Sequence, residues 1–182
     1  EMQRSLVGSE MCIETGFKVG IGTLASTASL ELLLAAPIES LDIDACVAKW
    51  KSWEETEKEI LCIFDGKPGF IDRALTETKN KYVDKEGLRR ELTAFKAAWP
   101  ELKERIRKQI IPFEEVRRRL KLVGAPYEPE QLGVSRARFR DTFAKIPYMR
   151  SRFSNIDIAY RCGFMDEWLE RLFGKGGIWE VE

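Results

Sequence analysis

The stretch TGFKVGIGTLASTA, Thr15–Ala28, decides how the first part of the chain folds. From Phe17 onward its apolar residues recur at intervals of three and four, which is the period of an α-helix. The pattern continues to Ala36, where Pro37 stops it. Because this helix is apolar on most of its sides, we expect it to lie in the centre of the fold.

Three glycines, Gly16, Gly20 and Gly22, interrupt this predicted helix. Glycine inside a helix costs about 0.5 to 1 kcal/mol relative to alanine, so three of them within seven residues require a reason. One reason is close packing of the helix against another backbone. The other is close approach to a ligand, with Lys18 supplying charge at the rim of a pocket. The glycines do not form GxGxxG and no strand precedes them, so we expect no dinucleotide-binding turn here.

The rest of the sequence keeps the helical period and contains almost no alternation of period two. One helix is capped by Asp42 or Asp44 and ends near Phe64; the others cover about 70–80, 85–98, 101–110, 112–123, 135–147, 154–162 and 166–173. Pro100 and Pro112 mark helix starts, and Gly163 separates the last two helices. The sequence therefore predicts an all-α domain of eight to ten helices over residues 1–182.

The helix that ends near Phe64 should be amphipathic. Its charged segment EETEKE, residues 54–59, is expected to face water. The side chains expected to face the core are Val47, Trp50, Trp53, Ile60, Leu61 and Phe64.

Composition excludes several classes of function. The chain has 30 basic and 30 acidic residues, so no net charge favours nucleic acid or an anionic membrane. We identify no apolar run of the roughly 18 to 20 residues needed to span a bilayer, so we expect no membrane insertion and a cytoplasmic location. The four cysteines are far apart in sequence and are expected to be buried, reduced thiols: Cys12, Cys46, Cys62 and Cys162.

The sequence contains no histidine. General acid–base catalysis at neutral pH would then depend on carboxylates, lysine, tyrosine or cysteine with shifted pKa values, and a serine or cysteine triad of the usual type is excluded. A transition metal would have to be bound by carboxylates and thiols alone. Glu10 and Glu14, one helical turn apart, could form a carboxylate pair, but a solvated helix face is the favoured interpretation. We therefore assign no catalytic, cofactor-binding or metal-binding residue to this chain.

Two segments carry a resemblance to a known family. GFKVGIGTLAST, residues 16–27, and LGVSRARFRDTFAKIPYMRSRFSNIDIAYRCGFMDEWLERLFG, residues 132–174, resemble the C-terminal helical domain of bacterial sn-glycerol-1-phosphate dehydrogenases. Those enzymes are relatives of iron-containing alcohol dehydrogenases and dehydroquinate synthases. The resemblance implies the helical metal and substrate half of a two-domain oxidoreductase acting on glycerol phosphate or dihydroxyacetone phosphate. In that family an N-terminal α/β domain binds NAD(P), and the metal is Zn²⁺ or Ni²⁺.

The resemblance fails at the catalytic centre. Thr15 stands where the family has a histidine ligand, followed by the matching Gly16, and the family's other ligands would precede Glu1. The neutral hydroxyl of threonine is a poor ligand for Zn²⁺ or Ni²⁺. We expect Thr15, Gly16 and Lys18 to lie near a substrate, and the chain alone to be inactive. Its expected partners are an N-terminal dinucleotide-binding domain, absent from this chain, or further copies of itself.

Two other functions are open. One is a stand-alone interaction or scaffold protein derived from that helical domain. The other is a transcription regulator of the arabinose-regulator type, because IDIAYRCGFMDEWLERLF, residues 156–173, resembles the second helix-turn-helix of such proteins and residues 132–143 could be the first. The short separation of the two units and the acidic MDEWLER segment disfavour DNA binding. Without a DNA-binding role, RARFRDTFAKIPYMRSR, residues 136–152, is interpreted as a basic, solvated helix face with Phe139 and Phe143 turned inward.

Overall fold

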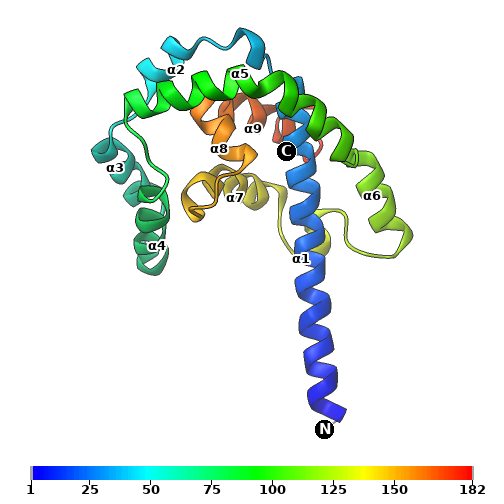
Figure 1. Ribbon diagram of the computed structural model, residues 1–182. Coiled ribbons are helices and arrows are strands. Elements are labelled where there is room, and N and C mark those ends of the chain that lie inside the picture. Colours follow the sequence, from blue (N-terminus) through cyan, green and yellow to red (C-terminus); the bar gives the residue numbers. More distant parts are fainter. Residues whose placement is uncertain (1, 182) are drawn as a thin grey trace.

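A computed structural model describes residues 2–181 of the chain and the side chains of residues 14–181. Within these residues the protein is all-α and contains no strand (Figure 1). The helices are α1 Met2–Ala35, α2 Ile43–Lys49, α3 Trp53–Ile63, α4 Pro68–Lys79, α5 Lys85–Gln109, α6 Phe113–Leu122, α7 Arg136–Met149, α8 Asn155–Cys162 and α9 Met165–Phe173. Short 3₁₀ turns cover Ile38–Ser40 and Pro129–Leu132. The prediction of an all-α fold with eight to ten helices is confirmed.

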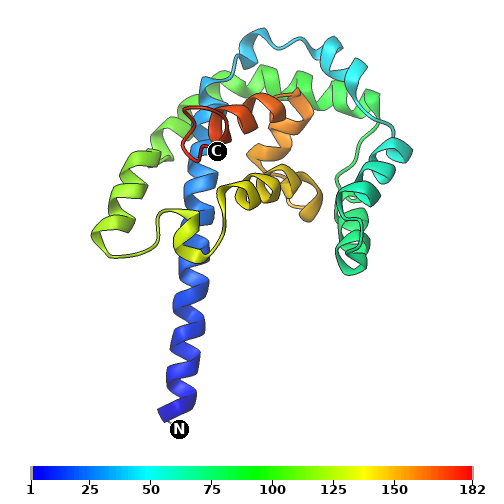
Figure 2. The ribbon, with the colours of Figure 1, turned by 180° about the vertical axis from the view of Figure 1, so that it is seen from behind.

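The second half of α1 lies in the core, as predicted, and the first half does not. Leu24, Ala28 and Leu33 are almost completely buried, whereas Val19 is 61% exposed. Figures 1 and 2 show the N-terminal half of α1 projecting away from the other helices. The helix also begins at Met2 and not near Phe17. No proline precedes Thr15 to stop it, and Gly16, Gly20 and Gly22 do not interrupt it.

By length and composition alone, one segment of α1 could cross a membrane. It covers Glu14–Ala35, and its most apolar part has a mean hydropathy of 1.3 and is 39% buried inside the protein. The expectation that no apolar run is long enough is therefore wrong. Core helices and N-terminal signal sequences share these features, so the segment does not decide where the protein is located.

The helix predicted to end near Phe64 is in fact two helices, α2 and α3. Asp42 caps α2, as predicted, by accepting a hydrogen bond from the Ala45 N–H at 2.9 Å. Ser52 begins α3 with a capping box in which its hydroxyl accepts from the Glu55 N–H at 3.2 Å and its own N–H donates to the Glu55 carboxylate at 2.8 Å. This reciprocal cap favours a new helix start over continuation of α2.

The break between α2 and α3 also changes which side chains face the core. Leu61 was predicted to be buried and is 45% exposed. The charged residues of EETEKE face outward or are half-buried, but Thr56 within that segment is buried and donates its hydroxyl to the Ser52 carbonyl at 2.8 Å.

Two prolines lie inside helices, although a helix start was predicted at Pro100 and a helix end at Pro147. α5 is one helix of 25 residues that continues through Pro100, and α7 continues through Pro147 to Met149. A proline in a helix removes one backbone donor and bends the helix, and burial of neighbouring side chains can offset this cost. Trp99, beside Pro100, is completely buried and its ring lies 5.4 Å from that of Phe95. Figure 1 shows α5 as a long, curved helix across the upper part of the fold, with α2 beside it.

Aromatic packing joins the C-terminal helices to the start of α6. Phe139 meets the rings of Phe173 and Trp179 at 5.7 and 5.0 Å, and Phe113 meets Trp179 at 5.7 Å. Phe143 is 1% exposed and also packs on Phe173. The predicted inward orientation of Phe139 and Phe143 is confirmed, and the last helices are held to the core by edge-to-face contacts.

Candidate functional site

The three residues predicted to lie near a substrate are on the projecting part of α1. Thr15, Gly16 and Lys18 are all exposed to solvent. The Lys18 ammonium pairs with the Glu14 carboxylate at 2.6 Å, and this hydrogen bond and attraction lower the pKa of Glu14. The side chain of Glu10 lies outside the described side chains, so the predicted carboxylate pair is not tested. A role of these residues near a substrate stays a prediction.

The glycines of α1 are not explained by packing within the described part of the chain. A β-carbon added at Gly16 or at Gly22 would meet no atom within 4 Å, and one at Gly20 would meet a methyl group of Leu120 at 3.5 Å. The last distance is an ordinary van der Waals contact. Close packing against another backbone of the described chain is therefore not the reason for Gly16 or Gly22.

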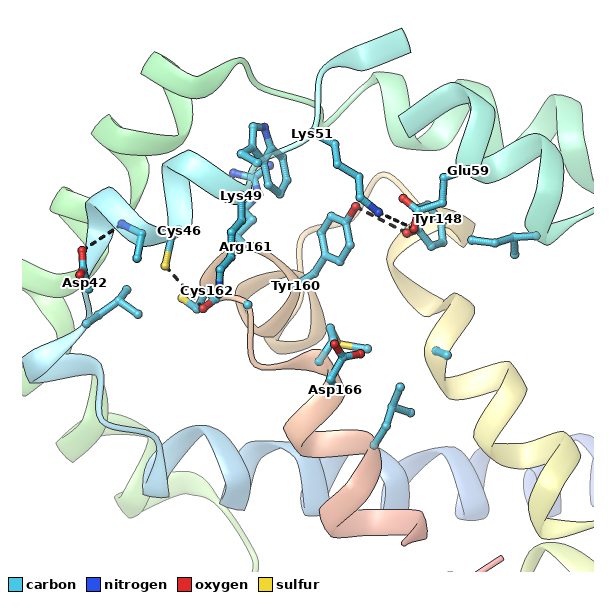
Figure 3. Close-up of a pocket in the computed structure, with 18 residues that line it drawn as sticks. Asp42, Cys46, Lys49, Lys51, Glu59, Tyr148, Tyr160, Arg161, Cys162 and Asp166 are labelled. Carbon is cyan, nitrogen blue, oxygen red and sulfur yellow. Dashed lines mark hydrogen bonds and ion pairs between the residues drawn. The ribbon is translucent and has the colours of Figure 1, made fainter. Parts of the chain in front are cut away.

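A cavity of about 630 Å³ lies elsewhere, between the α2–α3 segment, α7 and the α8–α9 turn (Figure 3). None of Thr15, Gly16 and Lys18 lines it. Its charged lining consists of three cations and three carboxylates: Lys49, Lys51, Arg161, Asp42, Glu59 and Asp166. Sequence reasoning missed this cavity because its residues come from several elements and form no local motif.

The polar end of the cavity is made by Lys51, Glu59, Tyr148 and Tyr160 (Figure 3). The Lys51 ammonium donates to Glu59 Oε1 at 2.7 Å, and the two tyrosine hydroxyls are 3.5 Å apart. Burial raises the pKa of both tyrosines, so each hydroxyl keeps its proton at neutral pH. Burial opposes the charged form of Lys51, but its hydrogen bond with Glu59 and the attraction between them outweigh this and raise its pKa.

Trp50 forms a fixed aromatic wall of the cavity. Its indole N–H donates to the Val83 carbonyl at 2.7 Å. Its ring meets Tyr160 edge-on at 5.5 Å and stacks on Tyr82 at 6.2 Å. The capping box at Ser52 ends the turn that carries Trp50, so the helix break that the sequence analysis missed is what places this ring.

Two thiols also line the cavity, and the described residues offer no metal site. Cys46 Sγ lies 3.5 Å from the carbonyl oxygen of Cys162, and burial raises the pKa of both thiols, that of Cys162 to about 12. Protonated thiols are poor nucleophiles and poor ligands. Among the described residues no group of three or more histidine, cysteine, aspartate or glutamate side chains could hold a metal ion. Cys162 is buried as expected, whereas Cys46 is half-buried and Cys62 is exposed, which corrects that prediction. The side chain of Cys12 lies outside the described side chains.

Arg161, on the other side of the cavity, makes contacts that hold neighbouring elements together. Its guanidinium pairs with Glu91 and donates to the Lys81 carbonyl, and it lies 4.7 Å from the ring of Phe153. Next to it, Lys81 forms a buried ion pair with Asp157. These contacts join α5 and the α4–α5 connection to α8.

The exposed face of α9 carries excess negative charge, which is unfavourable for a helix that reads DNA. α9 buries Trp168, Leu169, Leu172 and Phe173. Its exposed positions include three carboxylates and one guanidinium, at Asp166, Glu167, Glu170 and Arg171. A surface with excess negative charge is repelled by phosphates, which disfavours the regulator hypothesis.

Comparison with known proteins identifies no relative. No family model matches the chain, and no curated protein and no solved structure matches it.

Proposed function

We propose that this chain is the helical, substrate-side domain of a two-domain protein of the sn-glycerol-1-phosphate dehydrogenase type. In this proposal a nucleotide-binding domain covers the exposed stretch of α1 that contains Thr15, Gly16 and Lys18. The observation that carries the proposal is the open space at Gly16 and Gly22, where a β-carbon would meet no atom within 4 Å.

The energetic argument is direct. Each glycine in a helix costs about 0.5 to 1 kcal/mol relative to alanine. At Gly16 and Gly22 no atom of the described chain occupies the space that a β-carbon would fill. A ligand or a second backbone that approaches from outside would occupy it. Val19 lies between these glycines and leaves 61% of its surface in water, which a docked domain would cover. The all-α fold agrees with the helical half that the sequence resemblance implies.

The residues on α1 do not fit the family's metal. The position of the histidine ligand holds Thr15, the neighbouring Glu14 is paired with Lys18, and the sequence contains no histidine. A neutral hydroxyl beside an ammonium group is not a site for Zn²⁺ or Ni²⁺. We therefore derive no catalytic step through a metal and expect no hydride transfer by this chain alone.

The test is NADPH oxidation with dihydroxyacetone phosphate. The chain alone should give no turnover. It is then fused behind the nucleotide-binding domain of a bacterial sn-glycerol-1-phosphate dehydrogenase, with Thr15 unchanged or as Thr15→His, and assayed with Zn²⁺ or Ni²⁺. Thr23→His is the matched control, because Thr23 is also exposed on α1 but two turns away. We expect turnover only in the fused Thr15→His protein; turnover by the unmodified chain, or equal turnover with Thr23→His, contradicts the proposal.

The interaction-protein alternative uses the same exposed surface around Val19 without any chemistry. It predicts that the fused Thr15→His protein stays inactive while the chain still binds a protein partner through α1. Specific binding of the chain to duplex DNA would instead favour the regulator hypothesis.

A further inference from the structure

The polar end of the cavity between α2–α3, α7 and α8–α9 has no net charge, because its cation, Lys51, is paired with its carboxylate, Glu59. Arg161 is paired with Glu91 outside the cavity and offers no free positive charge to a ligand. The other charged groups of the lining, Lys49, Asp42 and Asp166, have both signs. An anion or a cation that enters the polar end would lose its hydration without a net attraction to offset the loss.

The hydrogen-bonding groups at the polar end have capacity for further bonds of both kinds. Glu59 Oε2 is buried and has no hydrogen-bond partner among the described residues. The Lys51 ammonium has three N–H donors, of which Glu59 Oε1 takes one at 2.7 Å. The hydroxyls of Tyr148 and Tyr160 meet only at 3.5 Å, which is long for a hydrogen bond between hydroxyls.

A hydroxyl group both donates and accepts a hydrogen bond, so neighbouring hydroxyls on one ligand could serve Glu59 Oε2 and Lys51 together. Aromatic faces and edges provide the apolar part of such a site. Trp50 is fixed by its hydrogen bond to the Val83 carbonyl and by stacking on Tyr82. Figure 3 shows Tyr160 extending toward Lys51 across the polar end. The volume of about 630 Å³ lies within the range of about 300 to 1,000 Å³ that small-molecule sites have.

We infer that this cavity binds a neutral, hydroxyl-rich small molecule of the size of a monosaccharide or disaccharide. Glu59 and Lys51 hold vicinal hydroxyl groups, Tyr160 contributes a hydroxyl, and Trp50 packs against the carbon skeleton. The inference is independent of the dehydrogenase proposal, because no residue of the α1 stretch lines this cavity.

Saturation-transfer NMR with the intact chain tests this directly. The neutral probes are glucose, galactose, xylose and maltose, and the charged probes are glucose 6-phosphate and glucosamine at neutral pH. We expect at least one neutral sugar to bind, and the charged derivatives of glucose to bind no better than glucose. Absence of binding by all four neutral sugars, or tighter binding of glucose 6-phosphate or glucosamine than of glucose itself, overturns the inference.

Variants then locate the site. Glu59→Gln removes a carboxylate acceptor, and Tyr160→Phe removes a hydroxyl. Each variant should weaken binding about tenfold, which corresponds to the loss of a hydrogen bond of about 1.4 kcal/mol. Glu54→Gln on the exposed face of α3 and Tyr127→Phe outside the cavity are the controls. Should either cavity variant unfold, Ala45→Trp fills the mouth from an exposed position, with Ala48→Trp on the same helix as its control. Binding that persists in Ala45→Trp contradicts the assignment of the site.

Discussion

At the scale of single residues, glycines with opposite backbone requirements allow a matched experiment. Gly22 is helical and faces open space, whereas Gly163 ends α8 with a φ of 75°. Gly22→Ala should raise the free energy of unfolding by about 0.5 to 1 kcal/mol, and Gly163→Ala should lower it by about 1 to 2 kcal/mol. Urea denaturation of the two variants measures both changes. A loss of stability in Gly22→Ala would mean that the chain itself needs this glycine.

The ion pair between Lys81 and Asp157 is a second residue-scale feature. The Asp157 carboxylate also accepts hydrogen bonds from the N–H and hydroxyl of Ser154 at 2.8 and 2.9 Å, and its side chain is 6% exposed. Asp157→Ala leaves a buried ammonium without a counter-charge and should cost about 3 to 5 kcal/mol.

The exposed pair of Lys145 and Asp141 provides the control for this experiment, since the Asp141 side chain is 60% exposed. Asp141→Ala should change the free energy of unfolding by no more than about 0.5 kcal/mol. Equal effects of the two aspartate variants in guanidinium denaturation would show that burial does not govern the Lys81–Asp157 pair.

The described thiols should react in the order of their exposure and pKa. Burial raises the pKa of Cys162 to about 12, so at pH 8 about one part in ten thousand is thiolate, whereas Cys62 is exposed. Raising the pH toward 12 should increase the labelling of Cys162. Iodoacetamide labelling of the native chain, followed by peptide mass spectrometry, should find Cys62 modified first and Cys162 last. Labelling of Cys162 as fast as Cys62 at pH 8 contradicts this environment.

Local chemistry made several single residues predictable. Asp42, Ser135 and Gly163 cap helices where the sequence places a short polar side chain or a glycine beside an apolar repeat. Glu59 and Tyr160 were not predictable as neighbours, because their proximity depends on how α3 and α8 meet and not on any local spacing.

At the scale of elements, the sequence rules for helix ends succeeded at Pro37 and Pro112 but failed at Pro100, at Pro147 and at the capping box of Ser52. Pro100 predicted a boundary, but burial of Trp99 keeps α5 continuous. The capping box at Ser52 divided a segment whose apolar period continues on both sides. Periodicity locates helical segments, while the competition between caps and tertiary burial decides where each helix stops.

One helix start in this protein is capped from a distant element. α6 begins at Phe113 without a side-chain cap of its own, and the Phe113 N–H donates to Glu31 Oε1 of α1 at 2.7 Å. Glu31→Ala should cost about 1 to 2 kcal/mol, which is typical for loss of a cap. Glu101→Ala, an exposed change on α5, should stay within about 0.5 kcal/mol. Thermal unfolding of both variants gives the comparison, and an unchanged midpoint for Glu31→Ala would remove this role of Glu31.

At the scale of the whole molecule, the fold class followed from the helical period, but the arrangement of the helices did not. The period predicts that the second half of α1 is buried, yet it gives no sign that the first half projects from the other helices. The cavity forms where the α2–α3 break meets the α8–α9 turn, and both depend on long-range packing. The exposed glycine stretch of α1 is the feature that the sequence singled out and that the fold leaves uncovered.

The most direct test of the central proposal is hydrogen exchange of α1 with and without the nucleotide-binding domain. The chain alone and the chain fused behind the nucleotide-binding domain of a bacterial sn-glycerol-1-phosphate dehydrogenase are compared by mass spectrometry. If that domain docks on the exposed stretch, amide exchange over residues 14–23 slows in the fused protein, while exchange in α9 is unchanged. Equal exchange over residues 14–23 in the two proteins would contradict the proposal that this stretch of α1 is completed by a nucleotide-binding domain.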